Sequence, residues 1–176
     1  MHAAITAVGN DRPGIVAAVS QVIFDTGGNI EDSRMAILGG HFAVVLIVAL
    51  PPDALLDALE SALQDATSSM DLTISVRPVA EASAEHDEGR AYTVRVYGSD
   101  RPGIVARVSS ALASHRFNVH DLATHVIEGA PAVYVMLIEG VAPASADTAA
   151  MERDLKTLAA ELGVEVSVEP NDPETL

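Results

Sequence analysis

The sequence of 176 residues contains no cysteine and no tryptophan, and it has only three phenylalanines and three tyrosines. Without cysteine, the chain cannot form disulfide bonds, thiolate zinc sites or a cysteine nucleophile. Because aromatic residues are so few, a hydrophobic core must be built from valine, isoleucine, leucine and alanine. Hydrophobic residues make up 49% of the chain, which is enough for such a core.

Basic residues are also scarce. Ten lysines and arginines against 25 aspartates and glutamates give a formal net charge of −15, and acidic residues outnumber basic ones in both halves. An acidic protein without a basic face has little to offer the phosphate backbone of a nucleic acid or an anionic membrane. We therefore expect the chain to bind neither nucleic acid directly nor a membrane.

Long hydrophobic runs are missing as well. The longest, residues 42–50, is too short to span a bilayer. The first residues, Met1-His2-Ala3-Ala4, have neither the basic segment nor the apolar run of a signal peptide. These features predict a cytoplasmic protein.

What the chain does have is an internal repeat. Gly-Asn-Asp-Arg-Pro-Gly-Ile-Val at 9–16 returns as Gly-Ser-Asp-Arg-Pro-Gly-Ile-Val at 98–105, an offset of 89 residues. The same offset aligns two further pairs of segments: 29–32 with 118–121, and 43–48 with 132–137. An offset kept through three separated segments predicts a duplicated domain. Domains of about 80 residues are only marginally stable alone, so we expect the two to pack against each other.

Hydrophobic periodicity predicts the same order of elements, β-α-β-β-α-β, in each repeat. The expected elements of the first repeat are a strand at 3–8, a helix at 13–26, strands at 29–38 and 42–50, a helix capped by Asp53 and running to 67, and a strand at 72–76. Those of the second are a strand at 92–97, a helix at 102–115, strands at 118–127 and 132–139, a connection at 140–146, a helix at 147–162 and a strand at 164–168. Gly27-Gly28 and Gly163 are predicted to end helices, and Gly39-Gly40 and Gly129-Ala130-Pro131 to form turns.

This order predicts an α+β fold, with two ferredoxin-like βαββαβ domains at 1–79 and 91–170. Each has a four-stranded antiparallel sheet with its helices on one face. The acidic stretch 80–90 lacks apolar periodicity and is predicted to be a linker, and 171–176 a frayed tail. The third strand of each sheet is apolar on both sides, whereas a solvated face should alternate. We therefore expect another chain to cover part of the open face, as in a homodimer.

The Asp-Arg-Pro-Gly stretch lies between a predicted strand and a predicted helix in each repeat. Pro13 is expected in the first helical turn, with Asp11 as the N-cap. Gly14 leaves the backbone uncovered, so an amino-acid carboxylate could approach the free amides of that turn. A well-capped helix start without a ligand is the alternative that these residues leave open.

The remaining polar residues do not predict a metal or catalytic site. His120 and His125 are five residues apart on a strand, so they face opposite sides, and His115 at a helix end favours the helix dipole. Glu31 and Asp32 also point to opposite faces, with no nucleophile or base nearby in the pattern. The arginines at 12 and 101 are expected to be solvated or paired with an acidic neighbour.

Asp-Arg-Pro-Gly-Ile-Val at the first turn, followed by Gly-Asn-Ile or Phe-Asn-Val at the start of the second strand, resembles the ACT domain. The resemblance covers 1–79 and 91–170, and the longer stretch 29–39 resembles tandem ACT-domain transcriptional regulators of glycine metabolism. It implies a protein that is not an enzyme, needs no cofactor, binds a small amino acid such as glycine or serine, and acts on a transcription factor or enzyme partner.

In similar domains the ligand lies between the first loop of one copy and the start of the second strand of a neighbour. Carried over by position, the implied ligand-binding residues are Asp11, Arg12, Pro13, Gly14, Ile15, Asn29 and Ile30 in the first repeat, and Asp100, Arg101, Pro102, Gly103, Ile104, Asn118 and Val119 in the second. Gly28 is interpreted as leaving room, whereas Phe117 either closes the pocket or packs in the core. We therefore expect the first site to be the more permissive.

Two other classes of function remain open. One is a non-catalytic regulatory subunit of an amino-acid or folate-pathway enzyme, since both repeats are ACT-like and no residues remain to form a catalytic domain. The other is a structural dimerisation module without a ligand. Amino-acid binding would exclude the module, and a co-purifying transcription factor would argue against the enzyme subunit.

Overall fold

The computed structural model describes residues 1–79, 89–129 and 132–171. The chain divides into two compact units, Met1–Ala84 and Glu85–Leu176, whose boundary falls outside these ranges. Most of the predicted linker, two residues of the predicted 129–131 turn and most of the tail also lie outside the described residues. Each unit is described by itself.

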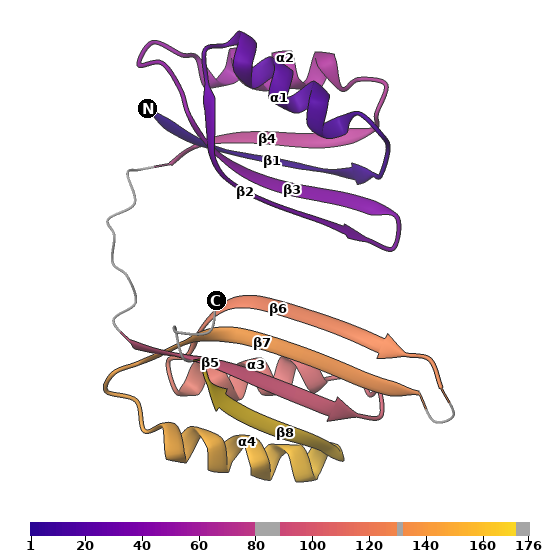
Figure 1. Ribbon diagram of the computed structural model, residues 1–176, viewed down its shortest axis with the longest axis vertical. Coiled ribbons are helices and arrows are strands. Elements are labelled where there is room, and N and C mark those ends of the chain that lie inside the picture. The colour runs from indigo at the N-terminus through magenta and orange to yellow at the C-terminus, as the bar shows by residue number, and fades with distance from the viewer. Residues whose placement is uncertain (80–88, 130–131, 172–176) are drawn as a thin grey trace. The chain divides into compact units, whose positions relative to one another are not determined.

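Both units have the predicted order of elements (Figure 1). The first unit contains β1 (His2–Asn10), α1 (Ile15–Asp25), β2 (Asn29–Leu38), β3 (His41–Ala49), α2 (Leu56–Ala66) and β4 (Leu72–Val79). The second contains β5 (Gly89–Gly98), α3 (Ile104–Ser114), β6 (Asn118–Ile127), β7 (Val133–Pro143), α4 (Thr148–Leu162) and β8 (Val164–Pro170).

Each unit is a four-stranded antiparallel sheet with its two helices on one face (Figure 1). The strand orders are β2-β3-β1-β4 and β6-β7-β5-β8, so the first and third strands are central, as predicted. The hydrophobic core of each unit is largely aliphatic, with Phe42 as the aromatic residue of the first and Tyr92, Phe117 and Tyr134 in the second. The predicted ferredoxin-like fold is confirmed.

The hairpin between the second and third strands is three residues longer in the second unit. Two residues join β2 to β3, whereas five join β6 to β7. Consequently Gly9 pairs with Phe42 and Gly98 with Tyr134, and the two partners are 92 residues apart rather than 89.

The offset of 89 between 43–48 and 132–137 is therefore wrong. It equates Val45, which is 49% exposed, with Tyr134, which is buried. An odd shift moves every side chain of a strand to the other face. A continuous apolar run does not reveal such a shift, because it lacks the alternation that would mark the faces.

β5 and β7 are both longer than predicted. β5 begins at Gly89, which pairs with Pro143 at the end of β7. The last residues of the predicted linker and the first of the predicted 140–146 connection are therefore paired strand. Asn171, assigned to the tail, donates its amide to the Ala91 carbonyl at 2.8 Å and accepts a hydrogen bond from Thr93 Oγ1 at 2.7 Å.

The second helices begin differently in the two units. α2 begins at Leu56 with Leu55 as its N-cap, so the predicted cap by Asp53 is wrong and Asp53 lies in the preceding turn. In α4, the Asp147 side chain accepts the Ala150 amide at 2.9 Å as a true N-cap. Among the helices of the described ranges, none has the length and apolar character needed to cross a membrane.

Candidate functional site

The Asp-Arg-Pro-Gly segment forms the same turn in both units. Gly14 has φ +97° and ψ −8°, and Gly103 has φ +96° and ψ −5°. These values fit the third position of a type II turn, which follows a proline and which glycine adopts without strain. The Pro-Gly pair therefore sets the direction in which the chain leaves the central strand and enters the helix.

The first helix of each unit begins later than the sequence predicts. α1 begins at Ile15 with Gly14 as its N-cap and no side-chain cap, and α3 begins in the same way after Gly103. The prediction that Pro13 lies in the first helical turn and that Asp11 caps it is wrong. The type II turn lies between Asp11 and the helix.

The first amides of α1 and α3 have no side-chain cap, and the space beside the preceding glycine is open. Neither helix has an acidic residue in its first turn. The first intrahelical bond of α1 runs from the Ala18 amide to the Gly14 carbonyl at 2.9 Å, so the preceding amides have no partner within the helix. Among the described residues, a Cβ built on Gly14 would meet only Met70 Cε, at 3.9 Å, and one on Gly103 would meet nothing within 4 Å. Free amides at a helix start favour an anion.

Arg12 joins the first turn to the segment after α2, and Arg101 joins the second turn to the last residue of α4. Arg12 Nη1 donates to the Ser69 carbonyl at 3.1 Å, and Arg101 Nη1 donates to the Leu162 carbonyl at 3.4 Å. Both arginines are exposed, as the solvated alternative predicts, and each also donates to a backbone carbonyl that the sequence did not predict. Sequence reasoning missed the two carbonyls because the contacts join positions 57 and 61 residues apart, without a local signal.

The two aspartates of the turns have different neighbours. The Asp11 amide donates to the Gly40 carbonyl of the β2–β3 hairpin at 2.9 Å. Asp100 lies close enough to Tyr134 to affect its phenol. Burial raises the pKa of Tyr134, and the negative charge of Asp100 raises this pKa further. A buried phenol therefore lies beside the second turn.

The first unit has no such phenol, because Phe42 takes the position of Tyr134. The Thr124 side chain hydrogen-bonds Tyr134, and the first-unit residue equivalent to Thr124 is Met35. At these two positions the first unit thus has apolar side chains where the second has a phenol and a hydroxyl group. This difference was not predicted, since the offset of 89 hides the equivalence of Phe42 and Tyr134.

Asn29 and Asn118 lie at the opposite end of their sheets from the turns. Asn29 pairs with Ala49, which also pairs with His2 at the start of β1, whereas Asp11 follows the end of β1. β1 and β2 run in the same direction, so a strand length separates these two points (Figure 1). A single unit therefore does not bring its predicted aspartate and asparagine together.

A β-bulge follows the start of β2 and of β6, with Glu31 and His120 as the extra residues. His2 Nε2 lies 3.1 Å from Glu31 Oε2, and Asn118 Nδ2 lies 3.3 Å from His120 Nε2. The bulge is thus the same in both units, although its polar contacts differ.

Gly28 does not leave room beside Asn29. A Cβ built on Gly28 would stand 2.9 Å from Leu50 Cδ2 and 3.1 Å from Ile23 Cγ2, so the space is filled. In the second unit Phe117 is buried in the core, which decides between the two alternatives for this residue. The physical reason for expecting a more permissive first site is therefore wrong.

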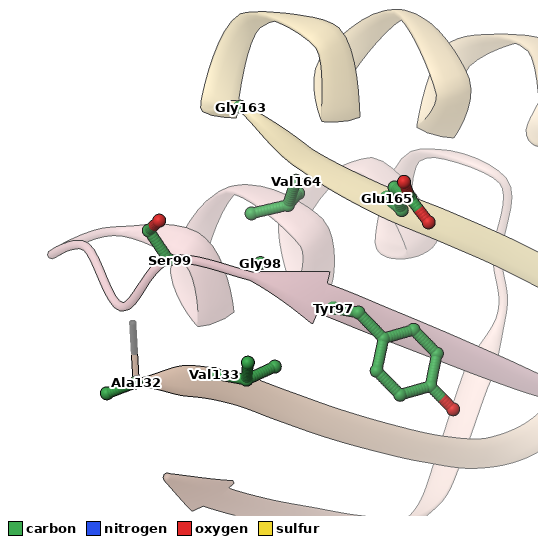
Figure 2. Close-up of a pocket in the computed structure, with 8 residues that line it drawn as sticks. All are labelled: Tyr97, Gly98, Ser99, Ala132, Val133, Gly163, Val164 and Glu165. Atoms are coloured by element: carbon green, nitrogen blue, oxygen red, sulfur yellow. The ribbon is translucent and has the colours of Figure 1, made fainter. Parts of the chain in front are cut away.

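A hollow of about 470 Å³ adjoins the second turn (Figure 2). Segments 97–99, 132–133 and 163–165 line it, at one end of the sheet. Tyr97 and Glu165 pair across β5 and β8, and Figure 2 shows their side chains near each other, with the Ser99 hydroxyl farther along. These three side chains, which the sequence did not single out, supply hydroxyl groups and a carboxylate.

Two of the three histidines of the second repeat have separate partners. His115 Nε2 lies 2.9 Å from Asp154 Oδ2 on α4, whereas His120 contacts Asn118. Within the described ranges, no three histidine, aspartate or glutamate side chains converge on a point where they could hold a metal ion.

Comparison with known proteins gives long matches. The chain is 32% identical over 167 residues to the glycine cleavage system transcriptional repressor of Escherichia coli (strain K12), covering 93% of this chain and 87% of that protein. It is 39% identical over 79 residues to a UPF0237 protein of Methanopyrus kandleri, covering 45% of this chain and 86% of that protein.

Two solved structures match nearly the whole chain. An unknown protein from Galdieria sulphuraria has a TM-score of 0.83 and 28% identity, over 97% of this chain and 98% of the other. A protein proposed to be a glycine cleavage system transcriptional repressor shares the fold, with a TM-score of 0.69 and 24% identity over 97% of each chain.

A family model described as the ACT domain matches twice, at residues 2–77 and 92–169. These matches coincide with the two sheets, from β1 to β4 and from β5 to β8. The tandem structure and the double match agree with the family that the turn sequence resembles, and the chain therefore belongs to the ACT domain family.

Proposed function

We propose that this chain is an amino-acid-sensing regulatory protein without catalytic activity. A small amino acid, glycine or serine-like, binds where ACT domains meet, and the bound state is passed on through protein–protein contacts. The regulated process is transcription of genes for glycine or one-carbon metabolism, in the cytoplasm. The partner that receives the signal is a transcription factor.

The observation that carries this proposal is the repeated turn. Gly14 and Gly103 have nearly identical backbone angles, and both precede a helix without a side-chain cap. By contrast, the Asp147 side chain caps α4. Two helix starts whose amides are left for an outside acceptor suit the carboxylate of an amino acid.

The ammonium group of the ligand needs acceptors as well. The carboxylate of Asp11 or Asp100 and the amide oxygen of Asn29 or Asn118 are of the right chemistry. Because each aspartate and asparagine lie at opposite ends of one sheet, the proposed site joins the turn of one ACT domain to the second strand of another. The matched repressor of Escherichia coli supports the link to glycine metabolism, since its name states that role.

The open face of the first sheet supports a homodimer. Val45 and Val8 are 49% and 51% exposed there, and Val45 is flanked on β3 by the half-buried Ala43 and Ile47. Apolar side chains on a solvated sheet face favour association. We propose that a second copy covers part of this face, and light scattering at micromolar concentration tests it: a dimer is expected, and a monomer would contradict the proposal.

A thermal-shift screen of the common amino acids tests the proposed function. A ligand that binds only the folded protein raises its melting temperature in proportion to RT ln(1 + [L]/Kd). We expect glycine, serine or a similarly small amino acid to raise it, and large amino acids to have less effect. If none raises it at millimolar concentration, the sensing function is wrong.

The apolar open face also favours one alternative, an association module without a ligand. Such a module would dimerise through the same sheet face but would not respond to amino acids. The screen and the light-scattering experiment together separate the two functions, because only a sensor shows both dimerisation and a ligand-dependent shift.

A further inference from the structure

We propose that Arg12 and Arg101 are positioning residues. Each holds its Pro-Gly turn in place through a hydrogen bond to the protein backbone and does not itself contact the ligand. The inference rests on the proposed amino-acid binding and names what maintains that site. Its basis is a contact that both units make between the second helix and the last strand: each guanidinium reaches a backbone carbonyl there, Ser69 in the turn after α2 and Leu162 as the last residue of α4.

The electrostatics of α4 explain why an arginine lies beside the end of the second helix in the second unit. The last turn of a helix carries a partial negative charge, which a basic side chain stabilises. Neither α2 nor α4 has a basic residue in its last turn. Arg101 supplies this positive charge from the neighbouring turn, and its guanidinium donates to the Leu162 carbonyl at the same time. Arg12 reaches the Ser69 carbonyl beyond the end of α2, so in the first unit the hydrogen bond alone joins the two segments.

In the second unit, a glycine at the end of α4 leaves space for the Arg101 guanidinium. Gly163 caps α4 in a left-handed conformation, with φ +66°. A Cβ built on Gly163 would stand 3.4 Å from Arg101 Nη1 and 3.7 Å from its Cζ. The guanidinium therefore lies over the backbone of Gly163, in space that another residue's side chain would share.

A second contact in each unit lies close to the arginine contact, between the end of the first strand and the start of the last. A Cβ built on Gly9, just before the first turn, would stand 2.3 Å from the Asp71 carbonyl oxygen. One built on Gly98 would stand 2.7 Å from Val164 Cγ1. The end of the first strand thus lies close against the start of the last strand in each unit, and the arginine joins the turn that follows to the segment just before that last strand.

In this arrangement the arginine N–H groups donate to the protein backbone and not to a ligand. In the second unit, the hollow beside the turn is lined by 97–99, 132–133 and 163–165, and Arg101 joins the residues that directly follow the first of these segments to Leu162, which directly precedes the last. Loss of the arginine would let the turn move relative to the end of the second helix. The amides of the first helical turn would then be less well placed for a carboxylate, although no ligand contact had been removed.

Amide hydrogen exchange in the ligand-free protein tests the inference first. The Ala18 amide donates to Gly14 and the Arg107 amide to Gly103, so each reports on its turn. We expect Arg12→Met to speed exchange at Ala18, and Arg101→Met to speed it at Arg107, by about three- to tenfold. An arginine that only contacts ligand would leave both rates unchanged, and that result would overturn the proposal.

Affinity for glycine or serine, measured by calorimetry on the same variants, tests the second half. We expect it to fall by about three- to tenfold. Arg101→Lys should restore part of both effects, since lysine also places a positive charge at the helix end. Faster exchange with unchanged affinity in both variants would overturn the positioning role. Arg153→Met, on the exposed surface of α4, is the control for lost charge and should change neither rate nor affinity.

These results separate the inference from the proposed function. If the wild-type protein binds no amino acid, the sensing function fails, and the positioning role at that site fails with it. If it binds an amino acid while exchange at Ala18 and Arg107 is unaffected by loss of the arginines, the sensing function stands and the positioning role alone is wrong.

Discussion

The ring of Phe117 lies against the backbone of Gly140, so that a Cβ built on Gly140 would stand 2.4 Å from Phe117 Cε1. The corresponding pair in the first unit is Gly28 and Val48, with the larger residue on the other partner. The larger residue of the pair thus lies just before the second strand in the second unit and on the third strand in the first.

We predict that these two positions are coupled in stability. Phe117→Ala should lower the free energy of unfolding by about 3–5 kcal/mol because it opens a cavity. Gly140→Val should lower it by about 3 kcal/mol or more, because a Cβ there would stand 2.1 Å from the Asn118 carbonyl oxygen as well as overlap the ring. The double variant should cost less than the sum, since valine fills part of the cavity. Urea unfolding followed by circular dichroism measures the cycle, and strictly additive costs would contradict this packing.

The Pro-Gly turn gives a prediction with a matched control. Gly14→Ala or Gly103→Ala forces alanine into a left-handed conformation, which costs about 1–2 kcal/mol. We expect that loss of stability together with weaker amino-acid binding. Gly39→Ala imposes a similar strain in the β2–β3 hairpin, where φ is +58° and nothing lies within 4 Å of the built Cβ among the described residues. It should lower stability without changing affinity, and equal loss of binding in Gly39→Ala would argue against the turn as the site.

Tyr134 predicts a loss of stability at alkaline pH. Burial, and then the charge of Asp100, raise its pKa above the usual value of about 10. A phenol whose pKa is higher in the folded than in the unfolded state keeps its proton longer when folded. Stability is therefore unaffected below pH 10 and falls as the pH rises through the folded pKa.

Tyr134→Phe should remove this part of the alkaline loss. The measurement is the urea midpoint of wild type and variant between pH 8 and pH 11. Tyr97→Phe, at an exposed position on β5, is the control and should leave the loss in place. Identical pH profiles for wild type and Tyr134→Phe would show that burial of the phenol has no such effect.

Local sequence chemistry was sufficient to predict the order of elements and several of their ends. Gly27 has φ +72°, and the Gly28 amide donates to the Ile23 carbonyl at 2.9 Å, as expected where glycines end a helix. Gly39 and Gly40 both have positive φ, which the shortest hairpin turn requires. Each of these features depends on a few adjacent residues, so the pattern contains the whole signal.

The register of the third strands and the contacts of the turns could not be predicted in this way. Val45 and Tyr134 belong to apolar runs without alternation, so only strand pairing reveals that they face opposite sides. Asp11 looked like an N-cap because a carboxylate near a helix start is common there. Because the type II turn lies between Asp11 and the helix, Asp11 is not the N-cap. The arginine contacts with Ser69 and Leu162 could not be predicted because they depend on how distant segments pack.

The acidic charge predicts that the isolated protein does not bind duplex DNA specifically at physiological salt. With a net charge of −15, its mean field repels the phosphate backbone. A gel shift with a regulated promoter and without any other protein should show no specific complex. A specific complex under these conditions would contradict regulation through protein contacts.

Calorimetric titration of wild type, Asp11→Ala and Asp100→Ala with glycine, serine and larger amino acids tests the central claim most directly. The account predicts that a small amino acid binds wild type. Loss of a charge-assisted hydrogen bond at either turn should weaken it by about 1.5–3 kcal/mol, or roughly ten- to hundredfold. If no amino acid binds wild type, or if both substitutions leave the affinity of a bound amino acid unchanged, the two turns are not the ligand sites of this protein.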